Sequence, residues 1–308
     1  MRLVFLGSGA FGLPTLESLA GKHEIALVVT QPDRPAGRHR QLTPTPIGED
    51  AAQRGWPVIK PEKVNDPAVV ERIRAINADA FVVIAFGQKL GRRLLDGIFA
   101  INLHGSLLPK YRGAAPINWA IIHGERETGV SVIALADRMD AGEVYAMSAT
   151  RIEPHATAGE MHDRLALLGP MVMHDVLDRH AEGEVIGKAQ DENLATLAPR
   201  LSKADGTVRF DQPAAAVRNR IHGLTPWPGC VIRLDGREVR VLRAEVTDAS
   251  ADRGSGGPGE VLADHSIACA PGVIRLLEVQ PAGRAAMSFD AYRNGHAVRI
   301  GSKAEAVA

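Results

Sequence analysis

The spacing of apolar residues in the N-terminal part of the chain predicts alternating strands and helices. Mainly apolar runs at residues 2–6, 24–30 and 79–86 predict buried strands. In the stretch 67–76 the apolar residues recur on one helical face, which predicts an amphipathic helix. The segment 81–86 has no polar residue, as a parallel strand covered on both faces requires. We therefore expect an α/β domain with a mostly parallel sheet.

The apolar pattern then becomes helical, then irregular, then alternating. A capping box at Thr157 and Glu160 begins one long predicted helix that continues to about His180. From residue 206 onward, short alternating runs are separated by turns, one of them at Asp235-Gly236. Such short strands with turn signals between them predict a small β-barrel.

These changes of pattern predict two domains joined by a linker. A length of 308 residues favours two domains over one. We expect the α/β domain over residues 1–185, a polar linker over 186–205 and the β-barrel domain over 206–308.

Composition excludes several classes of protein. Hydrophobic residues make up 45% of the chain and charged residues 23%, with a formal net charge of zero, so any contact with RNA needs a local basic patch. Cys230 and Cys269 have neither CxxC nor zinc spacing, and we expect reduced cysteines and no metal. We see no signal peptide and no run of the roughly 20 apolar residues that spans a bilayer, so we expect a cytoplasmic protein with no membrane partner.

The candidate chemistry lies at the end of a predicted strand. Asn102 and His104 are two residues apart and therefore point to the same side of that strand. An amide can donate to an oxyanion, and an imidazole can move a proton near neutral pH. Asp140, after the predicted strand 130–135, could orient the imidazole, with Asp137 as the rival carboxylate. The alternative for the Asn102 and His104 pair is a polar strand end that caps its own turn.

A glycine motif near the N-terminus opens a second possibility. Gly7, Gly9 and Gly12 form a G-x-G-x-x-G match between a predicted strand and helix, the fingerprint of dinucleotide binding and of a nicotinamide-dependent dehydrogenase. The second strand, however, ends in Thr-Gln-Pro and not in the acid that would bind a ribose. The glycines then serve a tight turn and close packing.

The segment that begins at Asn102 resembles the folate-dependent formyltransferases. It reads N-x-H-G-S-L-L-P-x-Y-R-G-A-A-P-I and is followed by E-T-G-V and D-x-G-[DE]. The resemblance implies a Rossmann-like catalytic domain in which Asn102, His104 and Asp140 are the catalytic trio. It implies formyl transfer from 10-formyltetrahydrofolate without a metal. The motif alone also fits relatives that formylate aminosugar nucleotides or glycinamide ribonucleotide.

A second resemblance concerns the folate pocket. The segment from Phe86 is similar to the A-Y-G-x-x-L stretch whose backbone lines the pterin pocket in this family, although a plain turn from strand to helix fits the same residues. The residues that we expect to bind folate are Phe86, Gly87, Gln88, Lys89, Leu90, Ser106, Leu107, Leu108, Pro109 and Met139.

Two further segments favour the branch of the family that formylates methionine on initiator methionyl-tRNA. The loop 31–47 is similar to an inserted loop, Q-P-D-R-P-x-G-R/K, that reaches the tRNA acceptor end, and it implies tRNA contacts by Arg34, Arg38 and Arg40. The Pro-Trp-Pro-Gly segment at 226–229 resembles the OB-like C-terminal domain that helps to hold tRNA. We expect a monomer that acts in translation initiation, with an aminosugar nucleotide as the alternative acceptor.

Overall fold

A seven-stranded sheet forms the centre of the first of two units in the computed structural model, which describes residues 1–37, 41–247 and 256–307. Its strands run in the order β10-β9-β7-β6-β1-β2-β5. β1, β2, β5, β6 and β7 run parallel to one another, and β9 is antiparallel to β7. The strands are β1 (Arg2–Gly7), β2 (Glu24–Val29), β5 (Val58–Ile59), β6 (Ala80–Ile84), β7 (Phe99–His104), β9 (Glu127–Ala134) and β10 (Val144–Arg151).

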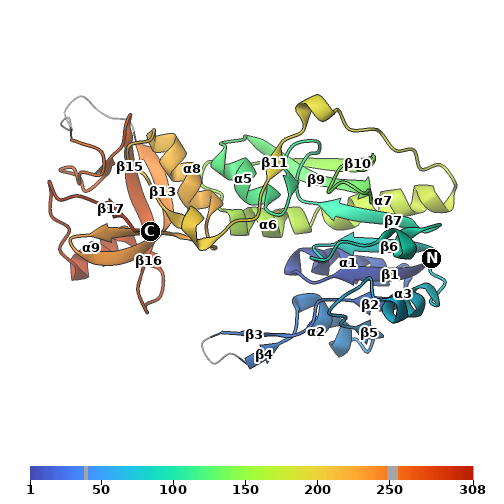
Figure 1. Cartoon of the computed structure of the whole chain (residues 1–308). Coiled ribbons are helices and arrows are strands. Elements are labelled where there is room, and N and C mark those ends of the chain that lie inside the picture. The colour runs from blue at the N-terminus through green and yellow to red at the C-terminus, as the bar shows by residue number, and fades with distance from the viewer. Residues whose placement is uncertain (38–40, 248–255, 308) are drawn as a thin grey trace. The chain divides into compact units, whose positions relative to one another are not determined.

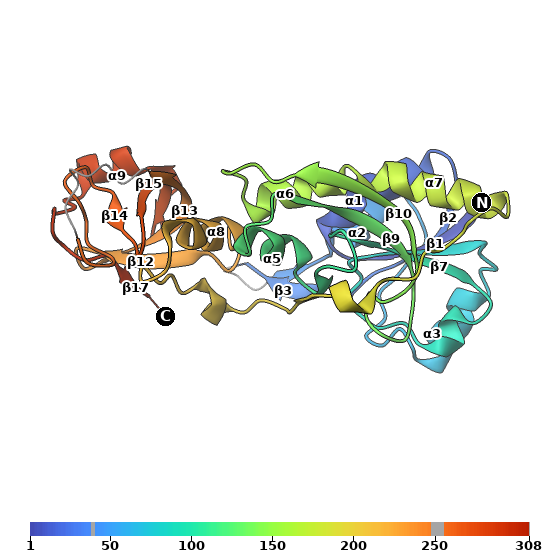
Figure 2. The ribbon, with the colours of Figure 1, turned by 90° about the horizontal axis from the view of Figure 1, so that it is seen from above.

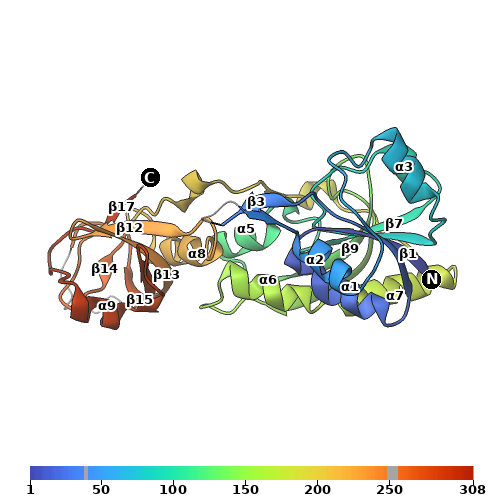
Figure 3. The ribbon, with the colours of Figure 1, turned by 90° about the horizontal axis from the view of Figure 1, so that it is seen from below.

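Helices cover both faces of this sheet. Figures 2 and 3 show α1 and α7 on one face and α3 on the other. Every residue of β6 is buried, which explains its unbroken apolar sequence. The helices of this part are η1 (Ala10–Gly12), α1 (Leu13–Ala20), α2 (Pro46–Gln53), α3 (Pro67–Arg74), α4 (Arg92–Leu95), α6 (Ala158–Ala166), α7 (Gly169–Ala181) and η2 (Glu192–Leu194).

The single long helix predicted from Thr157 to His180 is wrong, because the structure divides it into α6 and α7. Pro170 lies in the first turn of α7, where its missing N–H costs nothing, whereas inside a continuous helix it would remove a hydrogen bond. A Cβ on Gly169 would lie 2.4 Å from Oγ1 of Thr15, so the start of α7 also needs a glycine to lie against α1.

The predicted loop 31–47 contains a short hairpin. β3 (Arg34–Ala36) pairs with β4 (Gln41–Thr43) in antiparallel register, with Arg34 opposite Thr43. Figure 1 shows this β3–β4 hairpin extending away from the sheet of its own unit. Arg38 and Arg40, two of the three predicted tRNA contacts, lie outside the described residues.

The second unit is built on an antiparallel sheet in the order β14-β15-β13-β12-β17, with β16 also paired to β15. Register shifts beside Arg243 in β13 bend the strand, as bulges do. Asp235 and Gly236 have φ of +45° and +77°, so the predicted turn joins β12 to β13 with the backbone that tight hairpins require. The strands are β12 (Cys230–Leu234), β13 (Arg237–Thr247), β14 (Ile267–Ala268), β15 (Val273–Pro281), β16 (Met287–Ser288) and β17 (Glu305–Ala306).

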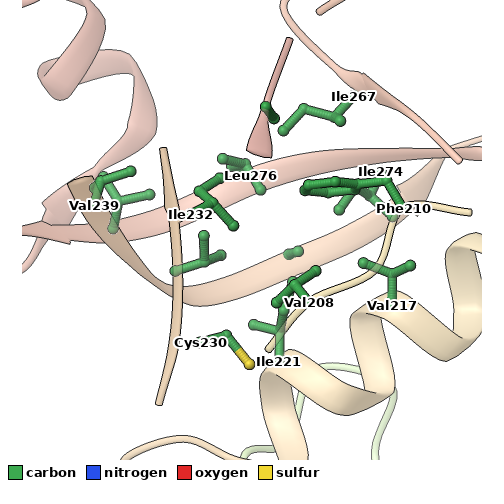
Figure 4. Packing of buried hydrophobic residues seen from close by; sticks show 14 of the residues in the cluster. Val208, Phe210, Val217, Ile221, Cys230, Ile232, Val239, Ile267, Ile274 and Leu276 are labelled. Carbon is green, nitrogen blue, oxygen red and sulfur yellow. The ribbon is translucent and has the colours of Figure 1, made fainter. Parts of the chain in front are cut away.

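The helix α8 packs against this second sheet and contributes to its hydrophobic core. Figure 4 shows Val217 and Ile221 of α8 facing Ile232 and Leu276 of the sheet, and all four are buried. The remaining elements of this part are β8 (Arg112–Gly113), α5 (Pro116–Ile122), β11 (Leu197–Ala198), η3 (Lys203–Gly206), α8 (Ala214–Gly223) and α9 (Phe289–Gly295). The predicted fold class is confirmed: a Rossmann-like, mostly parallel sheet with helices is followed by a curled antiparallel sheet.

The two units interleave along the chain. The first comprises Met1–Arg112, Gly129–Thr150 and His162–Thr196, and the second comprises Gly113–Thr128, Arg151–Met161 and Leu197–Ala308. The sequence-based boundaries at 185 and 206 stay a prediction. Among the described residues, no helix is long and apolar enough to cross a membrane.

Candidate active site

The carboxyl ends of the parallel strands β1, β2, β6 and β7 lie at one edge of the first sheet, and hydrogen bonds join the loops that follow β1, β2 and β6. Oγ of Ser8, after β1, donates to the carbonyl oxygen of Phe86, after β6, at 3.2 Å. Nε2 of Gln31, after β2, donates to the same oxygen at 3.0 Å. Open α/β sheets place ligands at this edge. The Phe86 carbonyl is therefore already held from two sides.

The glycine motif has a packing role in this structure. A Cβ on Gly7 would lie 2.9 Å from the carbonyl oxygen of Ile84 and 2.6 Å from the ring of Phe5. A Cβ on Gly12 would lie 3.3 Å from the same ring. Gly7 and Gly12 let β1 and η1 lie close to β6, so two of the three glycines have a packing role. A Cβ on Gly9 would make an ordinary contact, 3.5 Å from the Cβ of Ala85.

Asn102 and His104 lie on the same face of β7, as the two-residue period of a strand predicts. His104, the last residue of the strand, has a side chain only 6% exposed. Asn102 is partly exposed, and its side-chain amide makes no hydrogen bond with any residue that the structure describes. An unengaged amide beside a buried imidazole leaves its N–H donors available to a substrate.

Both ring nitrogens of His104 face oxygen atoms. Nε2 lies 2.8 Å from the carbonyl oxygen of Tyr111, and Nδ1 lies 3.6 Å from Oδ2 of Asp140. A neutral imidazole carries one N–H and an imidazolium carries two, so only the imidazolium can donate toward both oxygens. The arrangement suits a group that gains and loses a proton during a reaction.

The two candidate carboxylates differ in their exposure and in their partners. The Asp140 side chain is 15% exposed and lies beside His104. The Asp137 side chain is 81% exposed and pairs with Arg92 at 3.2 Å. Only the predicted member of the pair, Asp140, is therefore close to the imidazole.

Two residues that contact the His104 ring from different segments, Tyr111 and Asp140, have an unusual backbone conformation. Tyr111 has φ of +63° and Asp140 has φ of +52°, in the left-handed region that residues other than glycine rarely adopt. Such conformations persist where the surrounding structure holds them and are concentrated at functional sites. The two residues that carry the oxygens facing His104 are thus both held in strained backbone.

The segment 186–196, predicted as part of a linker, contacts the loops that carry Tyr111 and Asp140. Arg112 is 4% exposed and binds Gln190 and Glu192. Arg112 and Arg138 lower the pKa of the Glu192 carboxyl to about 2. Sequence reasoning missed Gln190, Glu192 and the role of Arg112, because a polar stretch without periodicity carries no signal for which residues lie at a site. The length of the irregular stretch was the one available hint.

The predicted folate residues occupy the loops after β6 and after β7, except Met139, which lies in the loop between β9 and β10. Phe86, Leu90, Ser106 and Leu108 are buried, whereas Met139 is 72% exposed. The remaining members, Gly87, Gln88, Lys89, Leu107 and Pro109, are exposed or partly exposed.

Hydrogen bonds fix both of these loops. Gln88 accepts from the Val64 N–H at 2.8 Å and donates to the Pro61 carbonyl at 3.0 Å, which fixes the loop after β6. Oγ of Ser106 donates to the Lys110 carbonyl at 2.6 Å, which fixes the loop after β7.

An open hollow lies beside the loop after β6. It has a volume of about 540 Å³ and is lined by Lys63, Val64, Asn65, Asp66, Pro67, Gln88 and Lys89. This volume is in the range of small-molecule sites, roughly 300–1,000 Å³. Two lysines and one aspartate are among its lining residues, which leaves the lining with a net positive charge.

The β3–β4 hairpin carries Arg34, the one predicted tRNA contact that is described. Arg34 is exposed and pairs with Glu62 at 2.7 Å. Beside it, Asp33 pairs with Lys60 at 2.6 Å, so ion pairs hold the base of the hairpin against the loop after β5. Leu42 on β4 is 71% exposed.

The two cysteines are free. Burial raises the pKa of each thiol to about 12, which keeps both protonated and unreactive near neutral pH. Within the described ranges, no group of three or more His, Cys, Asp and Glu side chains is arranged to hold a metal ion.

Comparisons with known proteins identify the family. A formyl transferase family model matches residues 1–177, and a model of the formyl transferase C-terminal domain matches residues 200–297. The methionyl-tRNA formyltransferase of Citrifermentans bemidjiense is 40% identical over 308 residues, which are 98% of this chain and 95% of that protein.

Solved structures show the same fold. The methionyl-tRNA formyltransferase from Clostridium thermocellum superposes with a TM-score of 0.56 at 14% identity, covering 81% of this chain and 95% of that one. HypX from Aquifex aeolicus in complex with tetrahydrofolic acid superposes with a TM-score of 0.64 at 16% identity, covering 95% of this chain and 47% of that one. With both family models matched in order along its length, the chain belongs to the formyl transferase family.

Proposed function

We propose that this enzyme transfers a formyl group to the α-amino group of methionine on initiator methionyl-tRNA, for translation initiation. The observation that carries the proposal is the nearly full-length likeness to a methionyl-tRNA formyltransferase, which extends over the C-terminal domain as well as the catalytic segment. Initiator tRNA is used where translation begins, so we place the enzyme in the cytoplasm. We propose that it acts there as a monomer.

The proposed formyl donor is 10-formyltetrahydrofolate. Two features support a folate site at the strand ends: the hollow of about 540 Å³ and the lysines Lys63 and Lys89 on its rim. A folate carries a glutamate tail with two carboxylates, which these ammonium groups can pair with. The backbone of the loop that begins at Phe86 would read the edge of the pterin, with the other predicted folate residues around it.

The proposed chemistry is attack of the neutral methionine amine on the formyl carbon. The new C–N bond forms, the bond from the formyl carbon to N10 of the folate breaks, the amine loses a proton and N10 gains one. Asn102 donates its amide N–H to the developing oxyanion, an interaction typically worth about 3 kcal/mol. His104 stabilises the same charge and moves the proton, and Asp140 orients its ring.

The proposed tRNA contact uses the β3–β4 hairpin. The hairpin extends from the first unit and carries Arg34 on its first strand, with Arg38 and Arg40 following in the sequence. Guanidinium groups suit phosphates and stack on unpaired bases, both of which an acceptor end offers.

A direct assay tests the function. The protein is incubated with 10-formyltetrahydrofolate and either methionyl initiator tRNA or an aminosugar nucleotide, and the N-formyl product is identified by mass spectrometry. Product on the tRNA is the expected result. Product on the sugar alone would overturn the proposed substrate while keeping the formyl transfer, and a tRNA charged with another amino acid serves as the control for the methionine.

A further inference from the structure

One glutamine in the segment 186–196, Gln190, is hydrogen-bonded to the loop that carries Asp140. Nε2 of Gln190 donates to the carbonyl oxygen of Asp140 at 2.8 Å and to that of Gly142 at 2.7 Å. A Cβ on Gly142 would lie 1.9 Å from the carbonyl oxygen of Ala134, so the loop already runs as close to β9 as a glycine permits. Gln190 therefore holds this loop through two backbone carbonyls, while Gly142 lies against β9.

The other end of the Gln190 amide is anchored by a buried cation. Oε1 of Gln190 accepts a hydrogen bond from Nε of Arg112 at 3.0 Å and another from Nη2 of Arg112 at 2.8 Å. Arg112 also binds both carboxylate oxygens of Glu192, at 3.1 and 2.9 Å. A primary amide has two N–H donors and two acceptor lone pairs, so Gln190 uses its whole hydrogen-bonding capacity here. Such a fully engaged amide has one orientation.

The same segment also holds the opposite side of His104. Oγ1 of Thr196 accepts from the Tyr111 N–H at 2.8 Å, and the Thr196 carbonyl accepts from the Arg112 N–H at 2.9 Å. The Tyr111 peptide carries the carbonyl that faces Nε2 of His104. One segment thus bonds to the backbone beside both residues whose oxygens face the imidazole.

The strained backbone explains why such a segment is needed. Tyr111 and Asp140 both have positive φ, a conformation that is unfavourable for residues other than glycine and that hydrogen bonds from the surrounding structure help to hold. Without Gln190, the loop around Asp140 could relax toward an ordinary backbone, which would turn the carboxylate away from Nδ1 of His104.

We propose that Gln190 is a positioning residue for formyl transfer: anchored by Arg112, it holds the Asp140 loop so that the carboxylate stays beside His104. The inference rests on the proposed function. A displacement of about 1 Å at a reacting group can lower turnover on the order of a hundredfold, so the effect should be large for a residue that never touches the substrate.

Two substitutions of Gln190 distinguish a role in positioning the Asp140 loop from a role in binding Arg112 alone. Gln190→Glu keeps the shape of the side chain and its pairing with Arg112, but it has no N–H for the carbonyls of Asp140 and Gly142. Gln190→Ala removes the hydrogen bonds to Arg112 as well as those to the two carbonyls. The matched control is Asn193→Ala, because Asn193 is exposed, lies in the same segment and, among the described residues, has a side chain that bonds only to Asp191.

The full-length protein is assayed for kcat and KM with methionyl initiator tRNA, for the pH dependence of kcat, and by NMR for the ring resonances of His104. We expect Gln190→Glu and Gln190→Ala each to lower kcat by roughly ten- to a hundredfold. The KM for tRNA should stay near that of the wild type, the pH profile of kcat should move, and the ring resonances should shift. Asn193→Ala should match the wild type throughout.

Two results would overturn the inference. A Gln190→Glu protein with wild-type kcat and an unmoved pH profile would show that the Arg112 connection alone suffices. Unshifted His104 resonances in both variants would show that the imidazole does not sense the loop. If the wild type transfers no formyl group, the proposed function fails by itself, and the NMR comparison still tests the positioning.

Discussion

Nδ1 of His104 lies 3.6 Å from Oδ2 of Asp140, while Nε2 of the same ring lies 2.8 Å from the Tyr111 carbonyl. The imidazole is 6% exposed, so solvent contributes little to its surroundings. Because the carboxylate is charged and the carbonyl is not, replacing Asp140 removes the stronger influence on the proton.

Asp140→Asn should lower kcat by about a hundredfold or more and change KM little, because it removes the charge that orients and stabilises the protonated ring. Asn tolerates the left-handed backbone at this position well, so the loop should keep its shape. The control is Asp137→Asn, which alters only an exposed ion pair with Arg92. Steady-state kinetics on both variants give the comparison, and equal activity in the two would contradict the assignment of Asp140.

Asn102→Ala should reduce kcat by roughly a hundred- to a thousandfold, since the amide donates to an oxyanion that exists only in the transition state. Asn102→Asp should lose more, because a carboxylate of nearly the same shape repels that charge. Single-turnover formyl transfer measures both, with circular dichroism to check the fold. The assignment fails if the Asp variant turns over as fast as the wild type.

Lys89→Ala should raise the KM for the folate roughly tenfold and leave kcat nearly unchanged, as expected when a charge-assisted hydrogen bond to a non-reacting carboxylate is lost. Lys89 lines the hollow of about 540 Å³ and donates to the Asp137 carbonyl at 3.0 Å. Lys22→Ala is the matched control, because Lys22 pairs with Asp178 and does not line the hollow. Titration of folate by fluorescence measures the affinity, and equal affinities in the two variants would argue against a folate tail in this hollow.

Arg38→Ala should weaken the use of tRNA and leave folate binding unchanged. Removing one phosphate contact should also lower the slope of log affinity against log salt by about one. Arg72→Ala, on the exposed face of α3, controls for the loss of a positive charge. Filter binding over a salt series measures the slope. An unchanged tRNA affinity would remove the hairpin from the proposed interface.

The stability of the protein should fall as the pH drops from about 6.5 to about 4, because of His222. Burial, together with Arg218 and Arg243, lowers the pKa of His222 from 6.5 to about 4. Its Nε2 also accepts a hydrogen bond from the Ala244 N–H at 3.1 Å, which protonation of that nitrogen would break. In this pH window the unfolded chain binds a proton that the folded chain does not. Stability should therefore decrease by about 3 kcal/mol from this group.

Urea unfolding at a series of pH values tests this expectation, with His222→Asn as the comparison. The variant lacks the titrating group, so its stability should depend less on pH between about 6.5 and 4. Above pH 6.5 the His222 ring is neutral in both the folded and the unfolded protein, so it adds nothing to the pH dependence of stability. Parallel curves for the wild type and the variant would show that His222 does not titrate differently on folding.

Local patterns in the chain predicted much of this fold and site. Apolar runs identified β1, β2 and β6, because a strand buried on both faces must be apolar along its whole length. The two-residue spacing of Asn102 and His104 placed both on one face, because side chains alternate along any strand. The turn at Asp235-Gly236 was predicted for the same kind of local reason.

Other features follow from contacts between distant segments, and the chain order does not show them. The choice between Asp140 and Asp137 depends on which one lies beside His104. The break between α6 and α7 has a local signal in Pro170, but the close approach of Gly169 to Thr15 is visible only in the fold. Gln190 became part of the site only because Arg112, 78 residues earlier in the chain, anchors its amide. The positive φ of Tyr111 and Asp140 is likewise imposed from outside. Periodicity and turn chemistry are encoded within a few residues, whereas a hydrogen bond that stabilises strained backbone exists only after folding has brought its two partners together.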